Sequence, residues 1–125
     1  MNYTEGSVCT HTAAAAIKRG QFVKFSAGNV TPCSVAGEQA YGVANNDAAS
    51  GQPCEVVLVG VALVRTAAAL SVGAAVTTDA NGNAVAASTS GHKINGVMQQ
   101  AGIVVDGTSY HLARCLLRDG LTAVA

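Results

Sequence analysis

The chain has 125 residues, of which 50% are hydrophobic, 4% aromatic and 11% charged, and its formal net charge is +0. This length predicts one domain, and the neutral balance argues against nucleic-acid binding because no basic field is available to attract phosphates. No apolar run reaches the roughly 18 residues that a membrane-spanning helix needs.

The first twelve residues are polar and contain no turn signal. They predict an extended N-terminal arm that adds a strand to the edge of a partner sheet. An ordinary first strand of the domain and a frayed terminus are the alternatives. The opening Met1-Asn2-Tyr3-Thr4-Glu5 lacks the basic-then-apolar pattern of a signal peptide, which predicts synthesis in the cytoplasm. Residues 13–125 are expected to form a single β domain.

Alternation of apolar and polar residues, punctuated by Gly, Asn and Asp, dominates the rest of the chain. This pattern is typical of short strands joined by tight turns, so the expected fold class is all-β. Two Ala-rich stretches, 13–18 and 66–70, allow at most one helical turn each, and a turn leading into a hairpin is favoured over a helix. The expected strands are 6–12, 21–26, 30–33, 40–44, 54–65, 74–78, 84–87, 94–99, 102–105 and 108–117.

The two halves of the chain, 17–65 and 70–118, repeat one pattern at an offset of about 53 to 54 residues. Each copy is expected to end in a long apolar strand, at 55–64 and at 110–117. Two similar β units predict one pseudo-symmetric barrel or sandwich, because neither copy could cover its apolar face alone. The first copy reads Ile17-x-x-Gly20-x-x-Val23, a Gly-Asn turn and Tyr41-Gly42-Val43, and the second reads Leu70-x-x-Gly73-x-x-Val76, an Asn-Gly turn and Ile94-Asn95-Gly96-Val97.

The ionisable residues do not form a recognisable catalytic set. Most of the seven carboxylates fall in turn contexts, where a short acceptor caps backbone donors. Nucleophile-elbow, phosphate-loop and dinucleotide motifs are all missing. The basic residues Lys18, Arg19 and Lys24 lie near Phe22 and Phe25, but strand alternation favours a core face with a solvated edge over a nucleic-acid site. The sequence therefore predicts no catalytic residue and no cofactor.

A metal site can be written from Cys9, His11, His111 and Cys115, but the spacing lacks the paired knuckles of structural zinc sites. No metal ion is predicted. The other two of the four cysteines are Cys33 and Cys54. Two disulfides are allowed by this even number, but most of these residues are expected to be free thiols that pack as small hydrophobic groups. The loop residue His92 is expected to be solvated.

Five segments of the chain resemble the small capsid cement, or head decoration, proteins of tailed bacteriophages. The similarity runs from about residue 17 to residue 117 and rests on Gly and Val spacing. The segments are 16–25 (AIKRGQFVKF), 41–44 (YGVA), 55–61 (EVVLVGV), 70–76 (LSVGAAV) and 94–97 (INGV).

This resemblance implies a small β-barrel or β-tulip-like domain that is not an enzyme and carries no cofactor. It implies a homo-oligomer, often a trimer, on the outer surface of the mature head, where major capsid subunits meet and the shell is strengthened after expansion. The four cysteines depart from what that role requires. With the polar N-terminal start, the resemblance also suggests that Asn2, Tyr3, Thr4 and Glu5 contact the capsid or a neighbouring subunit.

Two other functions remain open on sequence grounds. One is a small β-barrel module that binds a carbohydrate or another host-surface ligand through an exposed loop such as 87–93, although few polar aromatic residues are present to form a platform. The other is a metal-dependent hydrolase built from the Cys and His residues, which would bind zinc stoichiometrically.

Overall fold

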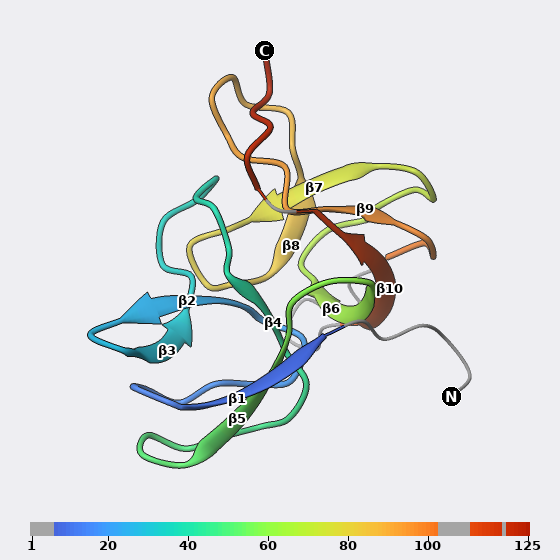
Figure 1. The fold of residues 1–125 in the computed structure, drawn as a ribbon. Coiled ribbons are helices and arrows are strands. Elements are labelled where there is room, and N and C mark those ends of the chain that lie inside the picture. The colour runs from blue at the N-terminus through green and yellow to red at the C-terminus, as the bar shows by residue number, and fades with distance from the viewer. Residues whose placement is uncertain (1–6, 103–110, 119) are drawn as a thin grey trace.

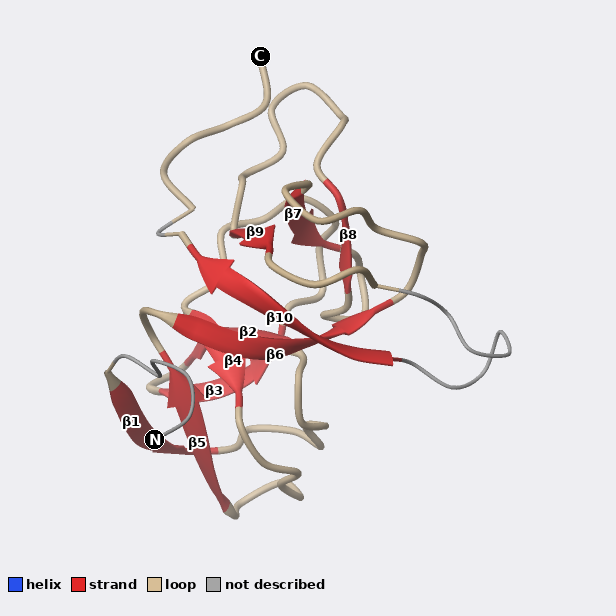
Figure 2. Cartoon of the chain, turned by 90° about the vertical axis from the view of Figure 1, so that its right-hand side faces the viewer, coloured by secondary structure: helices blue, strands red, loops and turns tan. Residues whose placement is uncertain are grey.

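The computed structural model describes residues 7–102, 111–118 and 120–125, and these contain ten strands and no helix (Figures 1 and 2). No described segment could therefore cross a bilayer as a helix. The all-β expectation is confirmed. The strands are β1 (Val8–Thr12), β2 (Phe22–Ser26), β3 (Asn29–Pro32), β4 (Gly42–Ala44), β5 (Pro53–Val57), β6 (Val61–Thr66), β7 (Ala75–Thr78), β8 (Ala84–Ala86), β9 (Gly96–Met98) and β10 (His111–Leu117).

The strands form two sheets with the same connectivity. The first sheet has the order β1-β5-β4-β2-β3, and the second is a closed barrel of order β10-β6-β8-β7-β9. Each strand of the first sheet corresponds to the strand five places later in the chain. β1 pairs with β5 as β6 pairs with β10, and β4 lies between β2 and β5 as β9 lies between β7 and β10. The expectation of two similar β units is therefore confirmed.

The backbone hydrogen bonds that follow the first strand of each unit are made by equivalent residues. Ile17 and Ala48 exchange two backbone bonds of 2.8 and 2.9 Å, and Leu70 and Gly102 exchange two of 2.7 and 2.9 Å. Further along, Val23 pairs with Gly42 as Val76 pairs with Gly96. These residues are the ones whose spacing repeats in the sequence, so the repeated pattern records a repeated backbone path.

Each unit is closed by a parallel contact between its first and third strands. In the second unit Thr66 of β6 pairs with Ala84 of β8. In the first unit Ala13, just after β1, forms a parallel bridge with Val30 of β3. The first sheet is therefore the more open version of the same small barrel.

The expected long strand 54–65 is wrong. The structure breaks it between β5 and β6, at Gly60, whose φ of 91° lies in the left-handed region that glycine adopts most readily. β5 belongs to the first sheet and β6 to the barrel, so this break is where the chain crosses from one unit to the other. Buried residues alternate with exposed or half-buried ones in both strands, and the residues that join them, 58–60, are also apolar, so the pattern continues across the break.

Other expected elements differ in detail. The stretch 13–18 forms bends and isolated bridges rather than a helical turn, and 66–70 contains the end of β6 followed by a bend. Gly102 forms a single bridge with Leu70, and the remainder of the expected strand 102–105 lies outside the described residues. Residues 106–107, which join the expected strands 102–105 and 108–117, also lie outside them.

The buried side chains form two clusters. One fills the first unit and includes Ile17, Val23 and Val30. The other runs from the interior of the barrel across to the first unit and joins Phe22 to Val64 and Met98. Because the second cluster takes residues from both units, the two barrels share one apolar junction.

Candidate functional site

Three rings gather on the surface of the first unit, and we call His11, Phe25 and Tyr41 the aromatic surface. The centroid of the Phe25 ring lies 4.1 Å from that of Tyr41, and the His11 ring meets both edge-on at 5.4 and 5.3 Å. The His11 Nε2 and Tyr41 Oη atoms are hydrogen-bonded at 2.8 Å. Phe25 is nevertheless 50% exposed. Phe25 is the aromatic member of the exposed large hydrophobic side chains among the described residues.

Strand alternation places these rings together. His11 on β1 lies opposite Cys54 of β5, and Phe25 on β2 lies opposite Val30 of β3. Cys54 and Val30 are buried in the cluster of the first unit, against which Tyr41 also packs. The aromatic surface therefore covers the open end of that cluster. Burial, followed by the neighbouring Cys9, raises the pKa of the Tyr41 hydroxyl, so the ring stays neutral and can donate to His11.

Sequence reasoning did not find this surface. The alternation in β2 separates Phe22 from Phe25, but it does not indicate which of the two faces is covered. In the structure Phe22 is 1% exposed and Phe25 half exposed. Lys24 lies between them and pairs with Glu38 at 3.1 Å, while Lys18 and Arg19 are exposed. The structure therefore buries Phe22 and leaves Phe25 half in water.

The second unit carries an open groove of about 600 Å³. Its floor contains Ala75 of β7 and Val97 of β9, which are paired with each other, together with Ile94. Arg118 contributes the cationic group of the rim. Most of the lining is aliphatic, so the groove suits an apolar or aromatic group better than a polar one. The other lining residues are Val59, Leu117 and Thr122.

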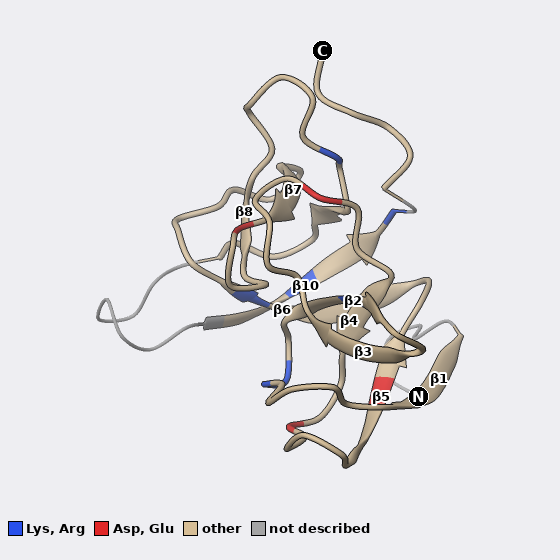
Figure 3. Ribbon diagram, turned by 90° about the vertical axis from the view of Figure 1, so that its left-hand side faces the viewer, with Lys and Arg blue, Asp and Glu red and all other residues tan. Residues whose placement is uncertain are grey.

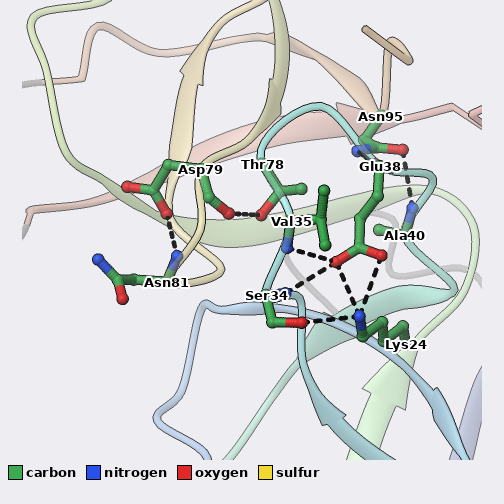
Figure 4. A network of polar contacts seen from close by, with 9 residues as sticks. All are labelled: Lys24, Ser34, Val35, Glu38, Ala40, Thr78, Asp79, Asn81 and Asn95. Carbon is green, nitrogen blue, oxygen red and sulfur yellow. Dashed lines mark hydrogen bonds and ion pairs between the residues drawn. The ribbon is translucent and has the colours of Figure 1, made fainter.

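A polar network joins the two units beside the shared cluster (Figure 4). The buried amide of Asn95 accepts from Ala40 N–H at 3.0 Å and donates to the Glu38 carbonyl at 2.9 Å. Gly37 N–H donates to the Thr78 carbonyl at 2.9 Å. Since Asn95 is 2% exposed and satisfied at both ends of its amide, it fixes the orientation of the 37–40 segment on the second unit.

The Glu38 carboxylate organises the turn that leads into this network. It accepts from the backbone N–H groups of Ser34 and Val35 at 2.8 and 2.9 Å, and from Lys24 Nζ. Partial burial by itself raises the pKa of Glu38, but these hydrogen bonds and the Lys24 charge outweigh it, so the net shift is downward. A single carboxylate tied to backbone donors is a structural cap, not a general acid or base.

The cysteines are all free thiols, as expected, and Cys33, Cys54 and Cys115 are buried. Burial is the largest cause that raises the pKa of Cys33 and of Cys115 to about 12. Cys9 is the exposed one. In the described part of the chain no group of three His, Cys, Asp or Glu residues could hold a metal ion. Cys115 lies in the core of the barrel, on a different unit from Cys9 and His11, and the His111 side chain lies outside what is described.

The predicted contact residues Asn2, Tyr3, Thr4 and Glu5 lie outside the described residues. The described chain starts just after them, where the Ser7 carbonyl accepts from Leu58 N–H. In the 87–93 segment His92 is not fully solvated, because its ring lies against Gly37. The backbone of that segment also bonds to the C-terminal residues, for example Gly91 N–H to the Val124 carbonyl at 2.9 Å.

Positions of Lys and Arg and of Asp and Glu are few and dispersed along the ribbon of the described residues (Figure 3). The fold defines a small all-β protein of two tandem β units, a five-stranded sheet and a closed barrel. The phage cement protein family matches residues 3–117, and the chain belongs to that family. It is therefore an auxiliary structural protein of a bacteriophage head, associated with the capsid of the virion. The resemblance seen in the sequence is confirmed.

The fold is shared with a solved structure, the N base of the head fiber gp8.5 in bacteriophage phi29. The two chains are 16% identical, and they align with a TM-score of 0.70 over 91% of this chain and 95% of that one. No curated protein matches the sequence.

Proposed function

We propose that this protein is a cement subunit that binds the outer surface of the mature head as a homo-oligomer, a trimer, at junctions of major capsid subunits, and stabilises the shell. The observation that carries the proposal is the family match over residues 3–117, nearly the whole chain. The phi29 head fiber base, which has the same fold, is likewise a part of a phage head.

The physical properties of the chain suit this role. A cement protein acts through many copies, so each site can be weak while the sum over the shell is large. Charged residues make up 11% of the chain, which limits the desolvation cost when a surface docks. A closed oligomer can present one patch to each symmetry-related capsid neighbour.

Within this proposal, Asn2, Tyr3, Thr4 and Glu5 form an arm that contacts the capsid or a neighbouring subunit, followed by the β domain. The first strand, β1, begins at Val8, after the proposed arm. Deleting residues 2–5 removes the arm and leaves β1 intact, whereas deleting through residue 8 would also shorten the strand.

Co-sedimentation with heads tests the proposal. The full chain should pellet with expanded heads and not with unexpanded ones, and bound heads should open at higher temperature than bare heads. The chain lacking residues 2–5 should keep its β circular dichroism and lose most of its head binding. Absence of binding to expanded heads would contradict the cement function, and full binding by the truncated chain would contradict the arm alone.

The alternative of a carbohydrate or host-surface module is supported less well. The segment proposed for it, 87–93, contains no Phe, Tyr or Trp. Its backbone is also held by the C-terminal residues, through the bridge between Lys93 and Ala123. A sugar platform requires exposed rings at the binding loop.

A further inference from the structure

The two units meet through different faces of their common fold. We call the face that the first unit contributes the covered face, and the face that the second unit contributes the covering face. The first unit contributes Phe22, Ala40 and Val43, which are buried in the shared cluster. The second contributes the opposite face, represented by Val64 and Asn95. Backbone bonds cross the junction here, from Phe22 N–H to the Gly82 carbonyl at 2.7 Å and from Arg65 N–H to the Gly20 carbonyl at 2.9 Å.

The covering face has an exposed counterpart on the first unit. Strand pairing makes Val64 equivalent to His11, since each lies opposite a buried residue of the unit's last strand. The same register makes Thr78 equivalent to Phe25. Asn95 and Tyr41 are equivalent because their N–H groups bond to the carbonyls of Val76 and Val23 respectively. The aromatic surface is therefore the covering face of the first unit, and Phe25 on it is 50% exposed among the residues that the structure describes. These three equivalences link Val64, Thr78 and Asn95 to His11, Phe25 and Tyr41.

The covered face has an exposed counterpart on the second unit. Phe22 pairs with Val43 as Ala75 pairs with Val97, so the two pairs are equivalent. Ile94 is the equivalent of Ala40, because each directly precedes one of the equivalent residues Asn95 and Tyr41. Ala75, Ile94 and Val97 line the open groove. Figure 1 shows the β2–β3 hairpin apart from strands β7 and β9, which carry Ala75 and Val97.

Equivalent glycines of the two units differ in the same way in how closely other atoms pack around them. A Cβ on Gly20 would lie 2.5 Å from Leu112 Cδ2, whereas the equivalent Gly73 has open space around it. A Cβ on Gly82 would lie 3.0 Å from the Phe22 carbonyl oxygen, whereas the equivalent Gly28 is open. In each pair the glycine at the internal junction is covered, and its partner at a free face is not.

The free faces differ from the internal junction in where the large side chains lie. At the internal junction the covered face carries the large ring of Phe22 and the covering face carries the small side chain of Thr78. At the free faces Ala75 stands at the position of Phe22, and Phe25 stands at the position of Thr78. Ala75 lines the groove, and Phe25 belongs to the aromatic surface. Repeating the junction between two copies therefore brings a face with projecting rings against a face with a hollow.

We infer that the aromatic surface of one copy of this chain docks into the groove of a second copy, repeating the internal junction between molecules. The C-terminal residues take some of the backbone donors of this face, since Ile94 N–H bonds to the Thr122 carbonyl. The groove remains open beside them. Because the two faces differ, the contact is heterologous, and copies joined by it either close into a ring or continue as a chain. This contact deepens the proposed function and rests on it for the existence of a homo-oligomer, since it names the two faces through which copies associate; it requires no capsid.

Two single variants and their mixture test the inference by sedimentation velocity. Phe25→Ser removes the central ring of the aromatic surface, and Ala75→Glu places a charge on the floor of the groove. The wild-type protein should self-associate with increasing concentration, and each variant should raise the dissociation constant at least tenfold. An equimolar mixture of the two variants should form a one-to-one dimer at a concentration where each alone is monomeric, because one intact face remains on each partner.

Matched controls are available on neighbouring exposed positions. Val8→Ser on β1 and Ala86→Glu on β8 change exposed residues outside both faces and should leave the association unchanged. A wild-type protein that stays monomeric at high concentration would overturn the inference, and so would an oligomer that Phe25→Ser and Ala75→Glu leave intact or a mixture that gives no dimer. Loss of head binding by Phe25→Ser with an unchanged oligomer would assign the aromatic surface to the capsid instead.

Discussion

Thr78 and Phe25 occupy the same position in the two β units, yet Thr78 is fully buried and Phe25 is 50% exposed. The backbone register around them is the same, so the difference arises from what lies on top. The first unit covers Thr78, and no part of the described chain covers Phe25. The environment of a residue in this protein therefore depends on which unit carries it.

Truncation of Phe22 should destabilise the fold far more than truncation of Phe25. Phe22→Ala opens a cavity in the cluster that both units share and should lower the free energy of unfolding by about 3–5 kcal/mol. Phe25→Ala removes a ring that is half in water and should cost less than about 1.5 kcal/mol in dilute protein. Urea denaturation measures both values, and equal losses would contradict the assignment of the two rings.

Loss of the Asn95 amide should weaken the junction between the units. Asn95→Ala leaves the Ala40 N–H and the Glu38 carbonyl without their partner, which should cost about 1–3 kcal/mol. Gln99→Ala, which removes an exposed amide nearby in the chain, serves as the control and should change stability by less than about 0.5 kcal/mol. Chemical denaturation of the two variants should separate them, and a silent Asn95→Ala would show that the network contributes nothing.

Acid should remove the contribution of Glu38 to stability. The pKa of Glu38 is lower in the folded protein than in the unfolded chain, so its contribution is present above the unfolded value, about 4.3, and is lost as the pH falls through the folded value. Glu38→Gln should therefore lower the free energy of unfolding at pH 7, by about 0.5–1.5 kcal/mol. The gap between the two proteins should close below about pH 4. A gap that stays constant from pH 7 to pH 3 would exclude a role for the charge.

Thiol labelling should distinguish Cys9 from the other three cysteines. The reactive species is the thiolate, and burial raises the pKa of Cys33 and Cys115 to about 12. Native protein should therefore react quickly at the exposed Cys9 and at no buried cysteine, whereas denatured protein should react at all four positions. Cys9→Ser should abolish the fast phase. A second fast thiol in the native protein would contradict the packing of the core.

A pair of equivalent glycines offers an internally matched comparison. Gly20 and Gly73 have φ values of 91° and 87°, so an alanine at either site incurs a similar backbone penalty of about 1–2 kcal/mol. Only at Gly20 would the new methyl group also collide with Leu112 and Arg65. Gly20→Ala should thus be less stable than Gly73→Ala by a further 1–3 kcal/mol or so. Equal melting temperatures for the two variants would contradict the covered position of Gly20.

The sequence alone determined the class of fold and its duplication. Alternating apolar residues and Gly-Asn punctuation specify short strands and turns locally, and the spacing of Ile17, Gly20 and Val23 against Leu70, Gly73 and Val76 records the repeated backbone path. The same spacing carried the resemblance to the cement family, which the family match confirms. These features can be predicted from the sequence because each depends on residues close together in the chain.

Only the tertiary structure decided where one unit ends and which faces remain free. The run 54–65 is mostly apolar, and its division at Gly60 depends on strand partners more than 40 residues away, such as Thr10 for Glu55 and Arg114 for Leu63. The exposure of Phe25 and the burial of Thr78 likewise follow from how the two units pack, which no local pattern encodes. Strand alternation fixes the side of a sheet to which a residue points, and long-range packing fixes whether that side is covered.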